Sequence, residues 1–203
     1  MSVLYSISSC VPLHQYTLIE MPLLPVDSLN KNWQVTQSVT ISPLKEKIND
    51  NITSTFITAW SVQDKQLTIV GLTATGQILM RLDYTNQELT EYYSPLIKRT
   101  IPGKEIMALL QLAHWPIVAI ETTVKDTQWQ VNALKNERDI YVDKQRAVNI
   151  INAPEGAPSG QNDAIIHNYI NRYTLHIKTL TINNLPWQMI QQPWNLALFT
   201  WHT

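Results

Sequence analysis

The sequence predicts a mainly β protein of the α+β class, in which a curved, incomplete antiparallel β-barrel wraps a central helical hairpin. Apolar and polar residues alternate with a period of two in both halves of the chain, which is typical of half-buried strands. A three- and four-residue apolar repeat interrupts this alternation at residues 103–115, as in an amphipathic helix. Only 15% of the residues are charged, so a large sheet with Thr, Ser, Gln and Asn on its wet face is expected. A flat α+β layer with the helix packed on one face fits the same periodicity.

Five strands are expected before the helix. Their alternation is clearest at residues 76–84, where Ile78, Met80, Leu82 and Tyr84 share one face. Two- and three-residue links, such as Asp64-Lys65, connect neighbouring strands tightly enough for antiparallel hairpins. The first half is therefore predicted to be a meander, with strands at 32–41, 53–62, 66–73, 76–84 and 88–94.

A helix is expected next, over residues 103–115, because Ile106, Leu109, Leu110 and Ala113 recur on one side. Pro116 ends that helix, since its ring clashes with a preceding helical residue, and it opens a second helical turn through residue 120. Alternation then resumes, which predicts further strands at 127–133, 138–143, 146–151, 164–169 and 173–182.

The chain of 203 residues is long enough for one domain with its own core, which we assign to residues 31–185. Residues 11–30 contain three prolines without steady periodicity and are expected to form an extended lead-in. Residues 186–203 form a tail with four large aromatic side chains, Trp187, Trp194, Phe199 and Trp201. This tail could add an edge strand, plug the barrel mouth or rest on a membrane interface.

The single cysteine, Cys10, follows Ile7-Ser8-Ser9, which is the pattern of a bacterial lipoprotein processing site. Acylation of its thiol would anchor the protein to a membrane. Residues 1–10 would then be a truncated signal region, because they contain neither the positive charge nor the length of apolar sequence that a signal peptide needs. Either a start upstream supplies these features, or Cys10 is an ordinary buried thiol.

Several function classes are disfavoured by composition. A net charge of −1 without a basic run gives no footprint for nucleic acid. A lone cysteine excludes an internal disulfide and a thiolate metal site, and the five histidines lack metal-ligand spacing. We find no glycine-rich phosphate loop and no nucleophile with a matching base, so we expect no metal, no cofactor and no enzyme activity.

The remaining candidate site is apolar. Strand and helix residues would face each other between the sheet and the helix, and they form either a filled core or a pocket for an acyl chain. These candidate ligand-binding residues are Phe56, Trp60, Ile78, Met80, Leu82, Leu109, Leu110, Leu112 and Trp115.

Five segments carry a resemblance that covers roughly residues 11–185. They are Phe56-Ile-Thr-Ala-Trp60, residues 67–77, Tyr93-Ser-Pro95, Leu110-Gln-Leu-Ala-His-Trp-Pro116 and residues 171–180. In these segments the chain resembles an uncharacterised family of short bacterial lipoproteins, whose members often accompany gene clusters for aryl-polyene or fatty-acid-like products. That family is similar in architecture to the LolA and LolB lipoprotein carriers, half-open barrels capped by helices that shelter acyl chains in the periplasm.

The resemblance implies a periplasm-facing outer-membrane lipoprotein that binds a lipid-like ligand or acyl chain in an apolar cleft. It matches Cys10 to the acylated cysteine, and Val11 after it is compatible with delivery to the outer membrane. It carries over no catalytic residue. The alternative is a non-enzymatic scaffold or interaction lipoprotein of an envelope biosynthesis or export system, with a filled core.

Overall fold

The computed structural model describes residues 20–29, 32–44, 53–96, 101–152 and 163–182. They form one ten-stranded sheet in which all neighbouring strands are antiparallel. The strands are β1 (Trp33–Pro43), β2 (Ser54–Gln63), β3 (Gln66–Leu72), β4 (Ile78–Tyr84), β5 (Leu89–Tyr93), β6 (Trp129–Leu134), β7 (Glu137–Val142), β8 (Gln145–Ile151), β9 (Ala164–Asn168) and β10 (Tyr173–Ile182).

The sheet consists of two meanders joined at its centre. Its strand order is β5-β4-β3-β2-β1-β10-β9-β8-β7-β6, so the first and last strands pair while β5 and β6 form the two edges. A ladder between β5 and β6 is not present in the described residues, and the sheet stays open. The predicted mainly β fold with an open, curved antiparallel sheet is therefore confirmed.

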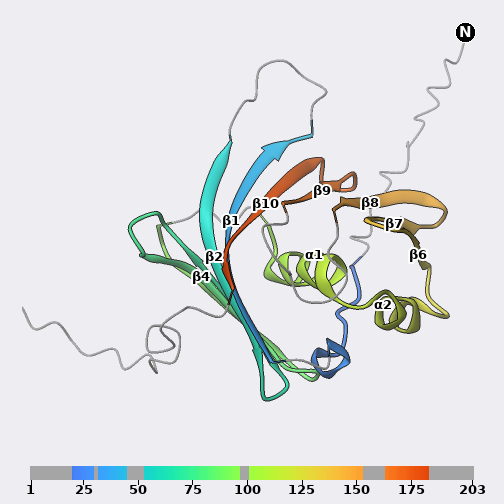
Figure 1. Cartoon of the computed structure of the whole chain (residues 1–203), viewed down its shortest axis with the longest axis horizontal. Helices are drawn as coiled ribbons and strands as arrows, with labels where there is room; N and C mark the ends of the chain where they lie inside the picture. Colours follow the sequence, from blue (N-terminus) through green and yellow to red (C-terminus); the bar gives the residue numbers. More distant parts are fainter. Residues whose placement is uncertain (1–19, 30–31, 45–52, 97–100, 153–162, 183–203) are drawn as a thin grey trace, which may run out of the picture.

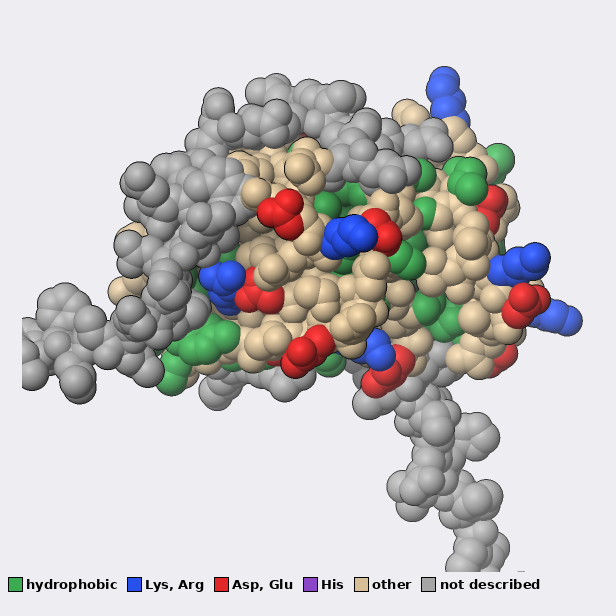
Figure 2. All heavy atoms as spheres, turned by 90° about the horizontal axis from the view of Figure 1, so that it is seen from below, with side chains coloured by type: hydrophobic (Ala, Val, Ile, Leu, Met, Phe, Trp, Pro, Cys, Tyr) green, Lys and Arg blue, Asp and Glu red, His purple; other side chains and the backbone are tan. Residues whose placement is uncertain are grey.

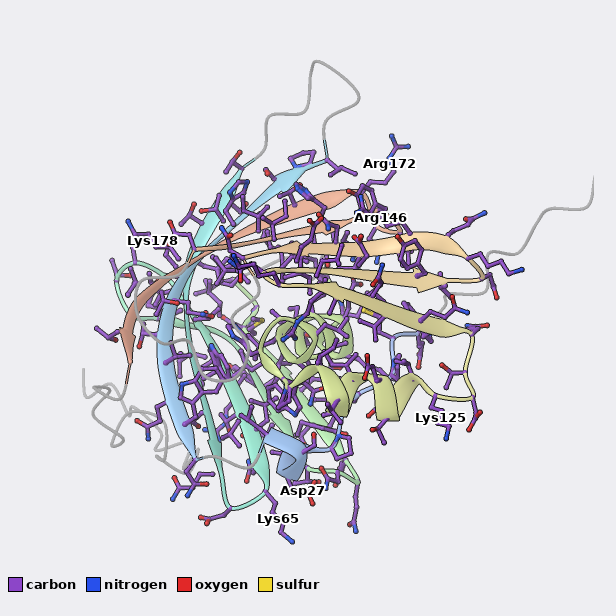
Figure 3. All side chains as sticks on the ribbon, turned by 45° about the vertical axis from the view of Figure 1, so that its right-hand side comes forward. Asp27, Lys65, Lys125, Arg146, Arg172 and Lys178 are labelled. Atoms are coloured by element: carbon purple, nitrogen blue, oxygen red, sulfur yellow. The ribbon has the colours of Figure 1, made fainter. Side chains whose placement is uncertain are left out.

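The sheet arches around one helix (Figure 1). Helix α1 (Gly103–His114) lies inside the arch, and α2 (Ile117–Val124) follows it toward the β6 edge. Both helices lie on the concave side of the sheet, as Figure 3 shows from a second direction. The flat-layer alternative does not describe this arrangement.

The concave face is apolar because each strand turns alternate side chains inward. In β1, Trp33, Val35 and Val39 are buried and alternate with half-buried polar residues. Cross-strand partners share a face, so Trp60 of β2 lies between Val35 and Ile69. Burial of this face against α1 forms one continuous core.

The described part of the expected lead-in belongs to that core. Met21, Leu24, Val26 and Leu29 are each less than 10% exposed, and Val26–Leu29 form a short 3-10 helix, η1. Residues 20–29 therefore pack against the domain and are not a free tether. None of the helices in the described residues is long and apolar enough to cross a membrane.

The predicted element order is confirmed, with small differences at the ends. The first helix ends at His114, one residue before the predicted end, because Trp115 adopts an extended conformation ahead of Pro116. The second helix continues beyond the single predicted turn, through Val124. Cys10, residues 1–19 and the tail from residue 183 lie outside the described residues.

Candidate functional site

The candidate site is the space between α1 and the concave face of the sheet. Helix α1 is apolar on most of its circumference, and its residues from Met107 to His114 are all buried. A helix with so broad an apolar surface must be enclosed, and the concave face of the sheet encloses it. The position of α1 is fixed by polar contacts at both of its ends.

A buried glutamine ties the N-terminal segment to α1. The Gln111 side-chain oxygen accepts a hydrogen bond from the Leu24 backbone N–H, and its amide nitrogen donates to the Leu24 carbonyl, both at 2.8 Å. The indole N–H of Trp115 donates to the Pro25 carbonyl at 3.1 Å. In the Gln-Leu-x-x-Trp-Pro segment, Gln111 and Trp115 therefore hold residues 20–29 in place by hydrogen bonds.

A buried arginine holds the C-terminal end of α1. Arg138 of β7 is only 4% exposed and donates to the carbonyls of Leu112 and Trp115, at 2.6 and 2.8 Å. Carbonyls in the last turn of a helix lack intrahelical partners and attract positive charge. Arg138 therefore satisfies these carbonyls where the chain turns from α1 into α2.

Glu105 holds the other end of α1 against the β9–β10 turn. One of its carboxylate oxygens accepts hydrogen bonds from Asn168, Asn171 and the Tyr173 hydroxyl, at 2.7, 2.7 and 2.6 Å. Burial, and then the contact with Glu105, raise the pKa of Tyr173 above its ordinary value, so this phenol stays protonated as a donor.

Gly103 begins α1 at a point of very close approach. A Cβ atom there would lie 2.6 Å from Cδ2 of Leu82 and 2.7 Å from the Tyr93 hydroxyl oxygen. Only glycine allows the helix start to pack this tightly against β4 and β5.

His114 is the last residue of α1 and packs against two indole rings. Its ring centroid lies 5.4 Å from that of Trp33 and 5.0 Å from that of Trp60. It is 1% exposed, and neither ring nitrogen has a hydrogen-bond partner among the described residues. Burial, and then the positive charge of Arg138, lower the pKa of His114 from 6.5 to about 3. The imidazole is therefore neutral at physiological pH and offers no cation to a bound anion.

A small cavity remains beside α1, with a volume of about 50 Å³. Its deep part is formed by Trp60, Ile69 and Leu109, each at most 1% exposed. Its rim is formed by side chains that are only partly buried. These rim residues are Ile41, Phe56, Ile101 and Ile106.

The polar side chains that line the cavity, Gln37, Thr58 and Tyr173, all have hydrogen-bond partners. Trp60 donates its indole N–H to the side-chain oxygen of Gln37 at 2.9 Å, and the Thr58 hydroxyl donates to the Gln37 carbonyl at 3.4 Å. The Gln37 amide nitrogen donates to the Thr179 hydroxyl at 3.4 Å. The wall that faces the cavity is consequently apolar.

The predicted ligand-binding residues divide into two groups. Phe56, Trp60, Leu109 and Leu110 line the cavity. The remaining five lie elsewhere: Met80, Leu82, Leu112 and Trp115 are buried in the core, and Ile78 is half-buried at the start of β4. The sequence places four of these five on the correct elements, whereas Trp115 lies directly after α1; it does not reveal which part of the core stays unfilled.

One part of the cavity wall was not predicted from the sequence. It comes from β1, β9 and β10, through Val39, Ile166, Leu175 and Ile177. The alternation of β1 and β10 indicates these inward faces, but only the β1–β10 pairing brings them together. That pairing joins residues at least 130 positions apart and follows from no local pattern.

Chemistry-bearing groups are sparse around this cavity. Within residues 20–29, 32–44, 53–96, 101–152 and 163–182, no three His, Cys, Asp or Glu side chains lie close enough to hold a metal ion. The hydrogen bonds of Arg138 and Glu105 position α1, and neither of these two charged residues lines the cavity.

A family model described as a protein of unknown function (DUF3261) matches residues 34–181. The chain belongs to this family. No curated protein matches the sequence. The residues matched to the DUF3261 family include all of β2 to β9, both helices and every residue that lines the cavity.

Proposed function

We propose that this DUF3261 protein binds a lipid-like ligand or acyl chain between α1 and the concave face of the sheet, as a lipid or lipoprotein carrier or a receptor-like accessory protein. The observation that supports the proposal is the apolar cavity, bounded by partly buried aliphatic and aromatic rim residues. Ligand pockets are mostly apolar with few polar groups. The open, arched sheet around one helix also agrees with the expected likeness to LolA and LolB carriers, which is part of this proposal.

The cavity must widen to hold a hydrocarbon chain. Its volume of about 50 Å³ is well below the roughly 150 Å³ of an engineered cavity that admits benzene. Widening at the rim needs only the partly buried side chains to move, whereas the deep wall is fixed by Trp60 and its bond to Gln37. We therefore expect a chain to enter past Ile41 and Phe56 and to displace Ile106 or the first turn of α1.

Cys10 completes the proposal as the anchor. If its thiol is acylated, the domain faces the periplasm from the outer membrane, where a hydrophobic ligand would need shelter from water. Mass spectrometry of the protein isolated from bacterial envelopes tests this part separately. A diacylglycerol-modified cysteine is expected at the N-terminus, and an unmodified thiol in the mature envelope protein would contradict it.

The binding proposal is tested with saturated fatty acids of increasing length, measured by displacement of a fluorescent fatty acid. Each buried methylene contributes about 0.8 kcal/mol, so the affinity should rise about fourfold per carbon until the cleft is filled. Ile41→Trp, at the rim, should abolish this dependence. Thr40→Trp, next to it on the opposite face of β1, should leave it intact. Equal affinities for all chain lengths, or equal loss in both variants, would contradict the proposal.

A second function is favoured by the small size of the cavity. A core this nearly filled suits a scaffold that binds partners through its surface or a strand edge. Within the described residues β5 and β6 are the two edges of the sheet, and the face seen in Figure 2 presents acidic and basic side chains side by side. Failure of every fatty acid to bind, together with capture of envelope proteins by the intact chain, would favour this alternative.

A further inference from the structure

The convex face of the sheet carries an apolar strip opposite α1. Trp60 and Ile69 face the cavity, so their neighbours Ala59 and Val70 point to the other side. These two residues are direct cross-strand partners, and the next pair on the same face is Ile57 with Leu72. We call these four residues the convex strip.

Two observations indicate that the Ala59–Val70 part of the convex strip is covered, whereas Ile57 and Leu72 are only partly buried. Ala59 is 2% exposed and Val70 is 4% exposed, although both described helices lie on the concave side (Figures 1 and 3). The hydroxyl of Thr36, which pairs with Ala59, is also buried and has no hydrogen-bond partner among the described residues. Outward-facing residues of a sheet with a wet convex face would be more exposed.

A segment of suitable chemistry begins beside the strip. Residues 183–203 contain no Asp, Glu, Lys or Arg, but they include three of the seven tryptophans. Exposure of such an uncharged, tryptophan-rich segment to water is unfavourable, and each tryptophan can bury roughly 150–250 Å² of surface. It follows β10 directly, and Thr181 of β10 pairs with Thr36 of β1, one strand away from Ala59.

We propose that residues 183–203 dock on the convex strip, as an outer layer of the sheet. The tail follows β10 directly, and β10 lies one strand away from β2, so this segment reaches the strip without a second copy. The N-terminal segment is also uncharged, but it leads into Glu20, which pairs with Lys104 on the first turn of α1, on the concave side. This proposal is independent of any ligand in the cavity.

Fluorine NMR of the full chain labelled with 5-fluorotryptophan tests the docking. Phe substitutions at Trp187, Trp194 and Trp201 assign the three tail signals. In a Cys10→Ser background, a nitroxide on Lys178→Cys should broaden these signals, because Lys178 is exposed and pairs with Ser38, the β1 neighbour of Ile57. A nitroxide on Lys125→Cys, at the end of α2 and far from Lys178 in Figure 3, should not.

A substitution within the convex strip provides a second test of the docking. Val70→Lys should move the tail signals to the position of solvent-exposed fluorotryptophan, whereas Thr55→Lys, an exposed position on the neighbouring strand β2, should not. Retained signals of Trp60 and Trp115 show that the variant is folded. If Val70→Lys unfolds the chain, the nitroxide measurement decides alone.

Three results would overturn the proposal. Tail signals at the solvent-exposed position in the parent protein, with no effect of the Lys178 label, would show an undocked tail. Broadening only between nitroxide-labelled and fluorine-labelled chains in a mixture would assign the strip to a second copy. Dispersion of the tail signals only after addition of phosphatidylethanolamine–phosphatidylglycerol vesicles would assign the tail to a membrane.

Discussion

Protonation of His114 should make the fold sensitive to mild acid. Its pKa is about 3 in the folded protein against 6.5 in an unfolded chain, because burial and the charge of Arg138 disfavour the imidazolium. Above pH 6.5 the ring is neutral in both states and the stability is complete. As the pH falls from 6.5 toward 3, the unfolded chain binds a proton that the folded protein does not. The free energy of unfolding therefore decreases in that range.

The magnitude follows from the size of the shift. One pH unit corresponds to about 1.4 kcal/mol per proton, so His114 should cost about 2 kcal/mol at pH 5 and about 4 kcal/mol at pH 3. Domains of this kind are stable by about 5–15 kcal/mol, so this one side chain is a sizeable part of the total. Because the ring packs against both Trp33 and Trp60, protonation should loosen this aromatic cluster first.

Urea unfolding between pH 4.5 and 8, followed by circular dichroism, measures this effect. His114→Phe should lose one proton's worth of pH dependence, about 1.4 kcal/mol per pH unit below pH 6.5, whatever its own stability. Leu112→Ala is the control, because it weakens the same helix without removing an ionisable group and should keep the slope of the parent protein. Equal slopes for His114→Phe and the parent would refute the reasoning, as would an imidazole NMR shift that titrates near pH 6.5.

Three further variants test how α1 is held. Gln111→Leu should lower the free energy of unfolding by about 2–4 kcal/mol, because it leaves two buried backbone groups of Leu24 without partners. Urea unfolding measures this loss, and Gln130→Leu, at an exposed position, is the neutral control. Arg138→Met should cost about 2–4 kcal/mol through the carbonyls it leaves unpaired, and it should also raise the pKa of the histidine at the end of α1, as read by NMR. Gly103→Ala should destabilise by about 1–3 kcal/mol despite the better helix propensity of alanine, because its Cβ would overlap the Leu82 side chain; a more stable variant would contradict the close packing.

Sequence reasoning predicted the local elements well because two-residue and helical periodicities are direct consequences of burial. The strand pattern at Ile78 to Tyr84 and the stop at Pro116 are both read from neighbouring residues, and the structure confirms both. The burial of Leu24 and the 3-10 helix after it were not predicted, because their cause is Gln111, a residue 87 positions away. Local patterns contain no trace of such a partner.

The candidate site was predicted only in part for a similar reason. Alternation shows that Phe56 and Trp60 face inward, and they do line the cavity. It does not show where inward-facing residues leave a cavity between them. That depends on how the side chains of α1, β1 and β10 pack together. Gln37 is an example. It is a polar residue on an apolar face, and only the structure explains it, by the hydrogen bond that it accepts from Trp60.

The central claim is that the cleft between α1 and the concave face accepts a hydrocarbon chain. A crystal structure of the protein with a terminally brominated fatty acid tests it most directly, because anomalous scattering locates the bromine without interpretation of weak density. The account predicts a bromine between Trp60, Ile69 and Leu109, with the rim residues displaced. Bromine found only on the outer surface, with the cavity unchanged at about 50 Å³, would contradict it.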